Sequence, residues 1–226
     1  MNRLIKVSGK GRLSLKPDRT VLNISMTRTY REYEKTVSKS IEHLDLLRSA
    51  VERAGLAGED LKTTEFYIDT EYEWYKSDGE EKRRLSGYSY RHDLFIEFDR
   101  DSGLTGRVLK EISGLGLNAT VNISYTVKNR ENAREELLGI CIRDAKRKAS
   151  VIAAASGVEL LGIVNIDYSV AEIDFYSKPM DNMMLSSSNE NVFADSLEGY
   201  LPLNIEPEDI STRDSVTIWW EIKDLN

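Results

Sequence analysis

The stretch that decides the fold is LKTTEFYIDTEYEWYK, residues 61–76, followed by LSGYSYRHDLFIEFDR, residues 85–100. Apolar and polar side chains alternate in both segments, which predicts two long strands joined by a polar loop over 77–82. Pairing residues whose numbers sum to 162 gathers the apolar side chains on one face. We therefore predict an antiparallel hairpin with these pairs: Phe66 with Ile96, Ile68 with Leu94, Tyr72 with Tyr90, and Trp74 with Tyr88.

The predicted hairpin is long for a chain of 226 residues. A strand of about 15 residues spans ~50 Å at roughly 3.3 Å per residue, whereas a compact chain of this length has a diameter of ~45 Å. We expect the hairpin to project and to expose its aromatic side chains; the alternative is that it folds back over the chain's own helices. The candidate interface for a second copy or a protein partner consists of aromatic residues: Tyr67, Tyr72, Trp74, Tyr75, Tyr88 and Tyr90.

Two further strands are predicted before this hairpin. Residues 4–16 alternate without a break, and residues 21–30 place Leu22, Ile24 and Met26 on one face. Because Pro17 and Asp18 between them are typical of a turn, we expect the two strands to form a hairpin. The sequence Gly9-Lys10-Gly11 resembles the start of a phosphate-binding loop, but it falls inside a strand, where glycines more often mark a close backbone approach.

Three helices and three more strands complete the pattern. Apolar residues at three- and four-residue steps predict helices over 33–54, 103–115 and 130–156. Strands are predicted at 117–127, within 158–173 and at 215–222. The order ββαββαβαββ predicts an α+β fold of largely antiparallel sheets packed with three helices, in a single domain over residues 1–226. In the last helix the expected buried stripe is Leu138, Ile142, Ala145, Ala149, Ile152 and Ser156.

The composition indicates a globular protein, with 40% hydrophobic and 31% charged residues and a net charge of −7. The acidity is concentrated, because ten acids and one base lie between Asp167 and Asp209. The connection over about 174–209 also holds three of the four prolines. It suits a lid or arm that binds a basic peptide or a protein partner, which is the alternative function. Nucleic-acid binding and a membrane span are not expected.

Few side chains offer catalytic or metal-binding chemistry. The chain has one cysteine, Cys141, and two histidines, His43 and His92. We expect Cys141 to be a small core residue at the edge of its helix stripe, because no histidine lies near it in the sequence to generate a thiolate. Both histidines are expected to be partly buried and hydrogen-bonded, with His92 opposite Thr70. We therefore expect no catalytic residue, no metal site and no cofactor, and a protein that is not an enzyme.

Four motifs in order resemble the SIMPL-domain family, a bacterial family of uncharacterised function. They are IKVSGKGRLSLKPDRTVLNISM (5–26), VERAGLAGEDLKTTEF (51–66), RLSGYSYRHDLFIEF (84–98) and IRDAKRKASVIAAASGVELLGIVNI (142–166). The resemblance implies an α+β subunit that builds homo-oligomers, with an association with stress tolerance. It supplies no catalytic residues, and His92 stands where many relatives have Asn.

These observations favour a non-enzymatic, homo-oligomeric assembly or scaffold protein. Because the opening residues MNRLIKVSGKG have no apolar core of a secretory signal, we expect a cytoplasmic location, whereas many relatives are exported.

Overall fold

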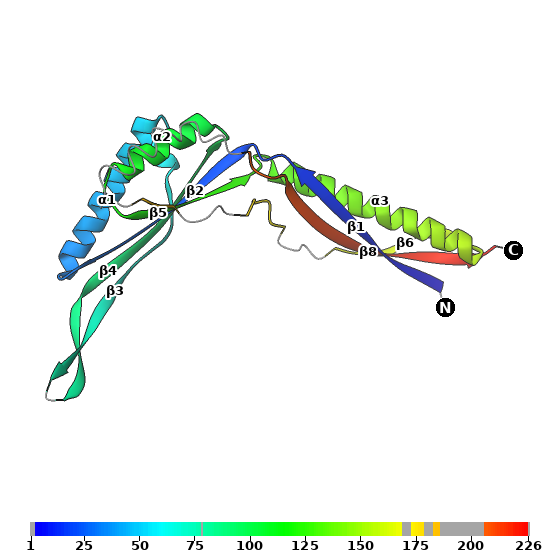
Figure 1. The fold of residues 1–226 in the computed structure, drawn as a ribbon. Helices are drawn as coiled ribbons and strands as arrows, with labels where there is room; N and C mark the ends of the chain where they lie inside the picture. Colours follow the sequence, from blue (N-terminus) through cyan, green and yellow to red (C-terminus); the bar gives the residue numbers. More distant parts are fainter. Residues whose placement is uncertain (1–2, 78, 169–172, 179–182, 186–205, 226) are drawn as a thin grey trace. The chain divides into compact units, whose positions relative to one another are not determined.

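The computed structural model describes residues 3–77, 79–168, 173–178, 183–185 and 206–225. The chain predicted as a single domain forms two compact units (Figure 1). Unit 1 comprises Met1–Pro17, Thr126–Ser177 and Glu208–Asn226, and unit 2 comprises Asp18–Tyr125 and Lys178–Pro207. Each unit has its own sheet, so the chain crosses between two sheets more than once.

Unit 2 is built on a five-stranded sheet in the order β3-β4-β2-β5-β7. β4 pairs antiparallel with β2 on one side and with β3 on the other, and β5 pairs antiparallel with β7. The short β7 is an addition to the predicted order and falls in the connection over 174–209, much of which lies outside the described residues. The strands are β2 Arg19–Tyr30, β3 Lys62–Ser77, β4 Glu80–Asp99, β5 Ala119–Thr126 and β7 Met183–Leu185.

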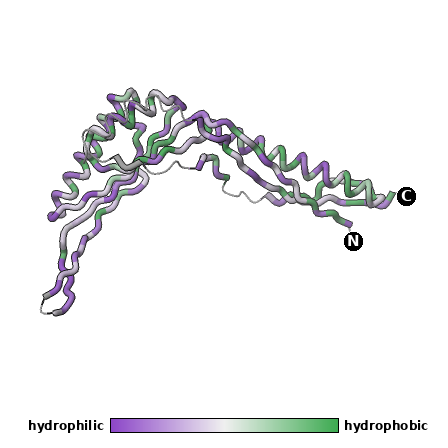
Figure 2. The backbone as a smooth tube through the Cα atoms, viewed as in Figure 1, coloured by the Kyte–Doolittle hydropathy of each residue, from purple (hydrophilic) through white to green (hydrophobic). Residues whose placement is uncertain are grey.

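Two helices pack on this sheet, α1 over Tyr33–Ala54 and α2 over Ser102–Ser113, with a 3-10 turn at Gly58–Asp60. Hydrophobic and hydrophilic segments alternate along the helices (Figure 2), as expected for helices with one buried side. The left-handed Gly55, at a φ of 103°, ends α1 where the sequence predicts. The core joins both helices to alternate residues of β2 and β4; among its members are Leu22, Ile24, Leu47, Val51, Leu94, Val108 and Leu109.

Unit 1 consists of a three-stranded antiparallel sheet in the order β1-β8-β6, packed against α3. Its elements are β1 Arg3–Leu15, α3 Arg130–Ser156, β6 Val158–Asp167 and β8 Ile210–Asp224. The residues of α3 that are buried recur at every fourth position: Ala133, Leu137, Cys141, Ala145, Ala149 and Ala153.

The stripe predicted for α3 was therefore only partly right. Ala145 and Ala149 are buried, and Ile142 is half-buried and packs against the same cluster, whereas Leu138 is half-buried and Ile152 and Ser156 are exposed. The physical reason is the close approach of β1. A Cβ atom on Gly9 would lie 2.6 Å from the backbone nitrogen of Ala145, and one on Gly11 would lie 2.7 Å from Cys141 Sγ. The glycines of β1 and the small side chains at Cys141 and Ala145 therefore permit the close approach, and Leu137 also contacts Gly11.

The predicted hairpin of the first two strands was also wrong. β1 pairs with β8 in unit 1, and β2 pairs with β4 in unit 2. Pro17 and Asp18 mark the passage from one unit to the other rather than a tight turn. The cause is that the two strands serve different cores: Val7 of β1 packs with Ala145 of α3, and Leu22 of β2 packs with Leu47 of α1.

The β3–β4 hairpin forms as predicted, but its register differs by four residues or more. Phe66 lies opposite His92, Ile68 opposite Tyr90, and Trp74 opposite Arg83. The strands pair as far as Ser77 opposite Glu80, so the loop predicted over 77–82 is mostly strand. The prediction failed because it paired apolar residues of β4 with apolar residues of β3. Leu94 lies opposite the polar Thr63 of β3, and the apolar partners of Ile96 and Leu94 are Leu22 and Ile24 of β2.

The α+β class, the three helices and the predicted order of seven strands are confirmed, with β7 in addition. The strand predicted within 158–173 is found at Val158–Asp167. The last strand was predicted too short, because it runs over Ile210–Asp224 rather than 215–222.

Candidate interaction surface

Part of the β3–β4 hairpin pairs with no third strand among the described residues, although Gly87 at its base packs against the backbone of Tyr30. β2 pairs with β4 only from Tyr88 to Asp99, so Glu71–Ser77 of β3 and Glu80–Gly87 of β4 pair with each other alone. We call these two segments the outer ribbon, and Lys62–Thr70 with Tyr88–Asp99 the inner ribbon. Within unit 2 the outer ribbon extends beyond α1 and β2 (Figure 1). The expectation of a projecting hairpin is met within this unit.

One face of the outer ribbon continues the core face of the inner ribbon. Ile68 lies opposite Tyr90, which is fully buried under α1. Because side chains alternate along β3, Thr70, Tyr72 and Trp74 follow on the same side. Helix α1 begins only at Tyr33, whose ring packs edge-on against Tyr88 at 5.5 Å. Beyond that pair, no helix in the described part of the chain covers the core face.

The uncovered face carries large side chains. Trp74 is 69% exposed, Leu85 47% and Tyr72 44%. Leu85 lies opposite Tyr72, and Arg83 lies opposite Trp74. The Arg83 guanidinium stacks 3.7 Å from the centre of the Tyr72 ring. Tryptophan, tyrosine and arginine are the residues most enriched at binding hot spots, so the face has the composition of an interface centre.

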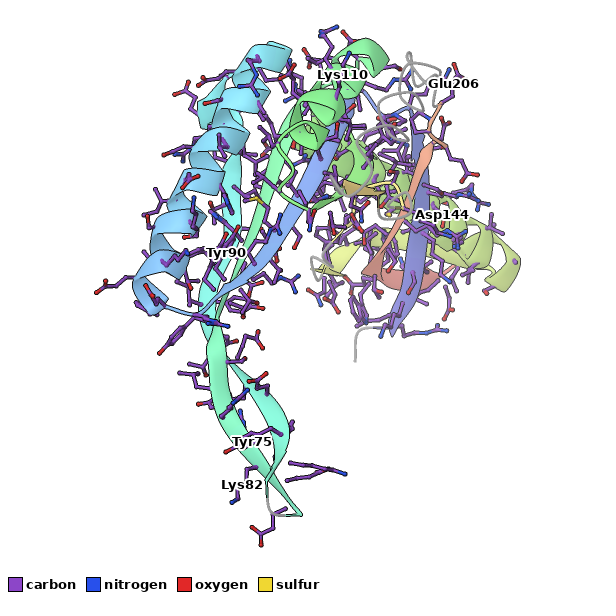
Figure 3. The ribbon with its side chains drawn as sticks, turned by 60° about the vertical axis from the view of Figure 1, so that its left-hand side comes forward. Tyr75, Lys82, Tyr90, Lys110, Asp144 and Glu206 are labelled. Atoms are coloured by element: carbon purple, nitrogen blue, oxygen red, sulfur yellow. The ribbon has the colours of Figure 1, made fainter. Side chains whose placement is uncertain are left out.

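The opposite face of the outer ribbon is more polar. Tyr75 lies opposite Lys82, and both lie toward the free end of the ribbon in Figure 3. Arg84 forms an ion pair with Glu73, and its guanidinium lies 5.0 Å from the centre of the Tyr75 ring. Both groups of the ion pair are exposed, so it contributes little to stability. The two faces differ in chemistry although they share the same two strands.

The predicted interface residues fall into three groups by burial: exposed, half-buried and fully buried. Tyr72, Trp74 and Tyr75 lie on the outer ribbon, and Tyr67 is an exposed residue of the inner ribbon. Tyr88 is half-buried at the boundary. Placing Tyr90 on this surface was wrong, because it is fully buried. The cause is the register: Tyr90 lies opposite Ile68 in the inner ribbon and not opposite Tyr72.

Tyr90 and His43 form a buried polar pair beneath α1. The Tyr90 hydroxyl lies 2.6 Å from His43 Nδ1. Burial raises the pKa of Tyr90 and lowers the pKa of His43. Both shifts favour the neutral forms, so a neutral hydrogen bond joins α1 to β4.

His92 is also a packed residue, as expected, though not opposite Thr70. It is 5% exposed, its Nε2 lies 2.9 Å from Thr63 Oγ1, and its ring lies 5.0 Å from that of Phe66. Burial lowers its pKa. Its buried Nδ1 has no hydrogen-bond partner among the described residues, which adds to the cost of charging the ring.

Cys141 is a fully buried thiol at the centre of the α3 stripe, and burial raises its pKa. A raised pKa opposes thiolate formation.

Sequence reasoning missed Asp144, which lies one turn after Cys141 on α3 and is labelled in Figure 3. Its carboxylate accepts a hydrogen bond from the backbone N–H of Lys10 at 2.9 Å and pairs with Arg147 and Lys148, which lowers its pKa. Its position one turn from Lys148 was a signal of a paired acid.

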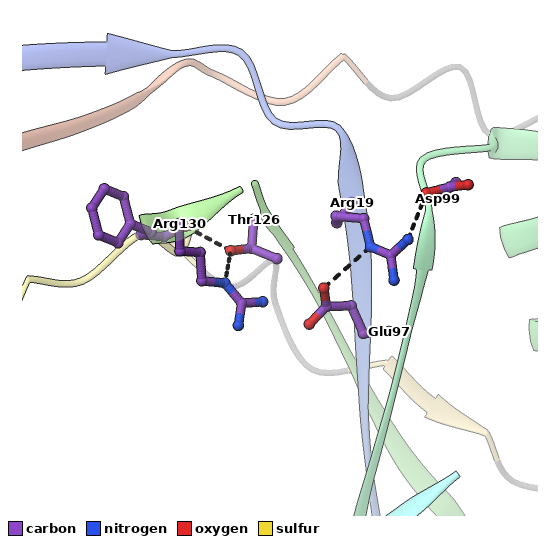
Figure 4. A network of polar contacts seen from close by, with 6 residues as sticks. Arg19, Glu97, Asp99, Thr126 and Arg130 are labelled. Atoms are coloured by element: carbon purple, nitrogen blue, oxygen red, sulfur yellow. Dashed lines mark hydrogen bonds and ion pairs between the residues drawn. The ribbon is translucent and has the colours of Figure 1, made fainter. Parts of the chain in front are cut away.

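Each unit has a further polar anchor (Figure 4). In unit 2, Arg19 binds Glu97 and Asp99 of β4 through separate guanidinium nitrogens. In unit 1, Arg130 Nε donates to Thr126 Oγ1 at 3.2 Å, and Thr126 Oγ1 donates to the carbonyl oxygen of Phe175 at 2.9 Å. These contacts fix strand ends.

Two properties of the described residues bear on function. They contain no group of three or more His, Cys, Asp or Glu side chains placed to hold a metal ion. None of their helices is long and apolar enough to cross a bilayer. The features described above define an α+β protein whose most distinctive surface is an exposed aromatic ribbon.

Comparison with known proteins identifies the family. The chain belongs to the SIMPL family, described as "Protein of unknown function (DUF541)", whose profile matches residues 5–220 and so runs through both units. The resemblance seen in the four motifs is thereby confirmed.

Two curated relatives carry the same name. The "26 kDa periplasmic immunogenic protein" of Brucella melitensis biotype 1 is 26% identical over 163 residues, and so is that of Brucella abortus (strain S19). The match covers 72% of this chain and 65% of each relative, which is less than two thirds of the relative's length. Their name describes them as periplasmic, which differs from the cytoplasmic location expected above.

Proposed function

We propose that this protein is a non-enzymatic, homo-oligomeric assembly protein whose outer ribbon is a subunit contact. One observation carries the proposal: the core face of the β3–β4 hairpin continues past the start of α1 with Tyr72, Trp74 and Leu85 exposed. In the inner ribbon, α1 covers this face. In the outer ribbon, a second molecule would cover it.

The physical argument rests on the stability of the ribbon itself. A two-stranded ribbon is marginally stable alone in water, and its open edges invite pairing. Burying Trp74 and its neighbours against another surface offsets the cost of keeping the ribbon ordered. A stable contact buries about 1,200–2,000 Å² in total and depends on a few aromatic or arginine anchors. The uncovered face supplies such anchors in Trp74, Tyr72 and Arg83.

The charge of the ribbon supports a second copy as the partner. Residues 71–85 contain five acids and four bases, a net charge of 4 − 5 = −1. Two copies therefore approach with little net repulsion, and each offers both signs of charge to the other. A strongly charged ribbon would instead have favoured a partner of opposite charge.

The side chains best suited to catalysis or metal binding, the two histidines and the cysteine, are engaged in packing. His43 binds Tyr90, His92 binds Thr63, and Cys141 lies against the glycine face of β1. The pKa shifts of all three favour the neutral form. These observations favour a structural role for the three residues, and we propose no reaction.

The test removes the aromatics from one face at a time. The double variant Tyr72→Ala/Trp74→Ala strips the uncovered face, whereas Tyr67→Ala/Tyr75→Ala removes two aromatics that point to the other side of β3. Loss of a hot-spot residue costs about 2 kcal/mol or more, roughly 30-fold in Kd. We expect light scattering at micromolar concentration to show a lower mass for the first variant only. Equal masses for wild type and both variants would rule out this contact.

The proposal does not depend on the compartment in which the protein works. The stress association and the alternative of a peptide-binding arm at 174–209 remain predictions from the sequence, because most of that segment lies outside the described residues.

A further inference from the structure

The two edges of the unit 1 sheet differ in how they are protected. β1 carries four bases and no acid: Arg3, Lys6, Lys10 and Arg12. Side chains of α3 also occupy its backbone groups, because Asp144 accepts from the Lys10 N–H at 2.9 Å and the Lys148 ammonium donates to the Ser8 carbonyl oxygen at 3.3 Å. Positive charge and occupied backbone groups both discourage pairing with another strand. The β1 edge is therefore blocked at its centre.

The β6 edge lacks this protection. β6 pairs with β8 on one side, and no described strand pairs with its other side. Residues 160–166, LLGIVNI, contain no charge and no proline. Four of them are large and about half exposed: Leu161 at 52%, Ile163 at 46%, Val164 at 53% and Ile166 at 50%. The pairing of β6 with β8 shifts register at Leu161 and at Val164. Such bulges are the only feature of residues 160–166 among those that protect natural edge strands from pairing with another chain.

We propose that β6 pairs antiparallel with β6 of a second copy of this chain, joining two three-stranded sheets into one. This contact lies in unit 1 and uses no residue of the outer ribbon, so it goes beyond the proposed function and stands or falls separately from it. The two contacts together give each chain two different self-binding surfaces, which extends an assembly beyond a dimer.

The sequence of β6 is complementary to itself in one register. Centred on Gly162, the antiparallel pair sets Leu161 opposite Ile163 and Leu160 opposite Val164. Glu159 then lies opposite Asn165, so no acid faces another acid. Centred instead on Ile163, the pair would set Glu159 opposite Asp167, and like charges directly opposite are destabilising. Centred on Leu161 or on Val164, it would set Glu159 opposite Ile163 or Leu161 opposite Asp167, so an apolar side chain would face an acid. The β1 edge of another copy is a poorer partner because its central backbone groups are already bonded. We therefore assign Gly162 to the two-fold centre.

A cysteine at the centre tests this register directly. Gly162 has no atom within 4 Å of an added Cβ, so Gly162→Cys fits, and the native Cys141 is fully buried. Opposed residues of an antiparallel pair have Cα atoms about 4.5–5.5 Å apart, within the range of about 4.4–6.8 Å that a disulfide bridges. The matched control is Ile166→Cys on the same strand, whose copies would lie about 26 Å apart at roughly 3.3 Å per residue.

Under a mild oxidant we expect Gly162→Cys to form a disulfide-linked dimer and Ile166→Cys to remain unlinked. Adding Val164→Lys should abolish the cross-link, whereas adding Val151→Lys, an equally exposed valine on α3 (59%), should preserve it. Tyr72→Ala/Trp74→Ala should also preserve it, because the ribbon is a separate contact. No cross-link at residue 162, or equal cross-linking at 162 and 166, overturns the proposal, whatever the ribbon variants show.

Hydrogen exchange provides a readout without any cysteine. In the wild-type chain, amides within 160–166 should exchange more slowly as protein concentration rises, and in Val164→Lys they should not. Exchange that is independent of concentration in the wild type would also overturn the proposal. If only the Val164→Lys variant dissociates, the β6 contact is supported and the proposed ribbon contact is overturned. If only Tyr72→Ala/Trp74→Ala dissociates, the ribbon contact is supported and the proposed β6 contact is overturned.

Discussion

The inner and outer ribbons are made of the same two strands, yet their aromatic side chains have opposite environments. Tyr90 in the inner ribbon is fully buried beneath α1, and Trp74 in the outer ribbon is 69% exposed. Both lie on the same face of the hairpin, and this face is part of the core of unit 2 where α1 covers it. The difference shows that the start of α1 at Tyr33, rather than the strand sequence, decides which part of the face is core. The uncovered remainder is what we assign to a second molecule.

The largest expected effect on stability is the difference between truncating two leucines of β4. Leu94 is 2% exposed in the inner ribbon, and Leu85 is 47% exposed in the outer ribbon. Leu94→Ala should lower the free energy of unfolding by about 2–5 kcal/mol because it leaves a cavity in the core. Leu85→Ala should lower it by less than about 0.5 kcal/mol. Urea denaturation at low protein concentration measures both, and equal losses would remove the distinction between the two halves.

A smaller effect is expected from removing single hydroxyl groups. Tyr90→Phe leaves His43 Nδ1 without its partner at 2.6 Å, and an unsatisfied buried group costs about 1–3 kcal/mol. Tyr72→Phe in the outer ribbon should leave the free energy of unfolding unchanged. The same denaturation curves compare the two; a stable Tyr90→Phe variant would show that the buried pair does not hold α1 on the sheet.

The pH dependence of stability should also come from the inner half of unit 2. Burial lowers the pKa of His43 and of His92 below the unfolded value, so the unfolded chain binds protons that the folded chain does not. Their stabilisation is complete above the unfolded pKa of about 6.5 and is lost as pH falls toward the folded values. The slope is at most about 1.4 kcal/mol per pH unit for each histidine.

Thermal unfolding between pH 7.5 and 5.5 checks this dependence. We expect His92→Gln to reduce the slope and Leu85→His, which adds a histidine to the outer ribbon, to leave it unchanged. A wild-type protein equally stable at both pH values would contradict the account of the two buried rings.

The smallest expected effect on stability is that of Trp74→Ala. Because Trp74 is exposed within its own chain, the free energy of unfolding at low concentration should change by no more than about 0.5 kcal/mol. A loss of several kcal/mol would mean that the tryptophan packs within its own unit and is not available to a partner.

The helices could be predicted well from the sequence because their signals are local. The spacing of Val37, Ile41 and Leu44 and the glycine at 55 locate α1 without any knowledge of its neighbours. The same holds for the bounds of α3, which begins after Asn129 and ends at the left-handed Gly157. Strand partners have no such local signal, so β1 and β2 were joined by the turn between them although they belong to different sheets.

The candidate surface was predictable in part. The aromatic cluster identified the ribbon, but the register that separates Tyr90 from Tyr72 depends on β2, a third strand that the hairpin sequence does not reveal. The stripe on α3 was missed because alanine at every fourth position is a weak apolar signal until the glycines of β1 are placed against it. Leu85 and Arg83 were missed because the candidate interface was chosen from aromatic residues alone, and Arg83 fell between the predicted loop over 77–82 and the predicted strand over 85–100.

The mass of the native particle tests the central claim most directly. Sedimentation equilibrium over a range of micromolar concentrations should give the wild-type chain a mass that is a multiple of 25.7 kDa. The Tyr72→Ala/Trp74→Ala variant, still folded by circular dichroism, should have a lower mass at the same concentrations. A wild-type protein that sediments at the mass of one chain at every concentration would contradict the account.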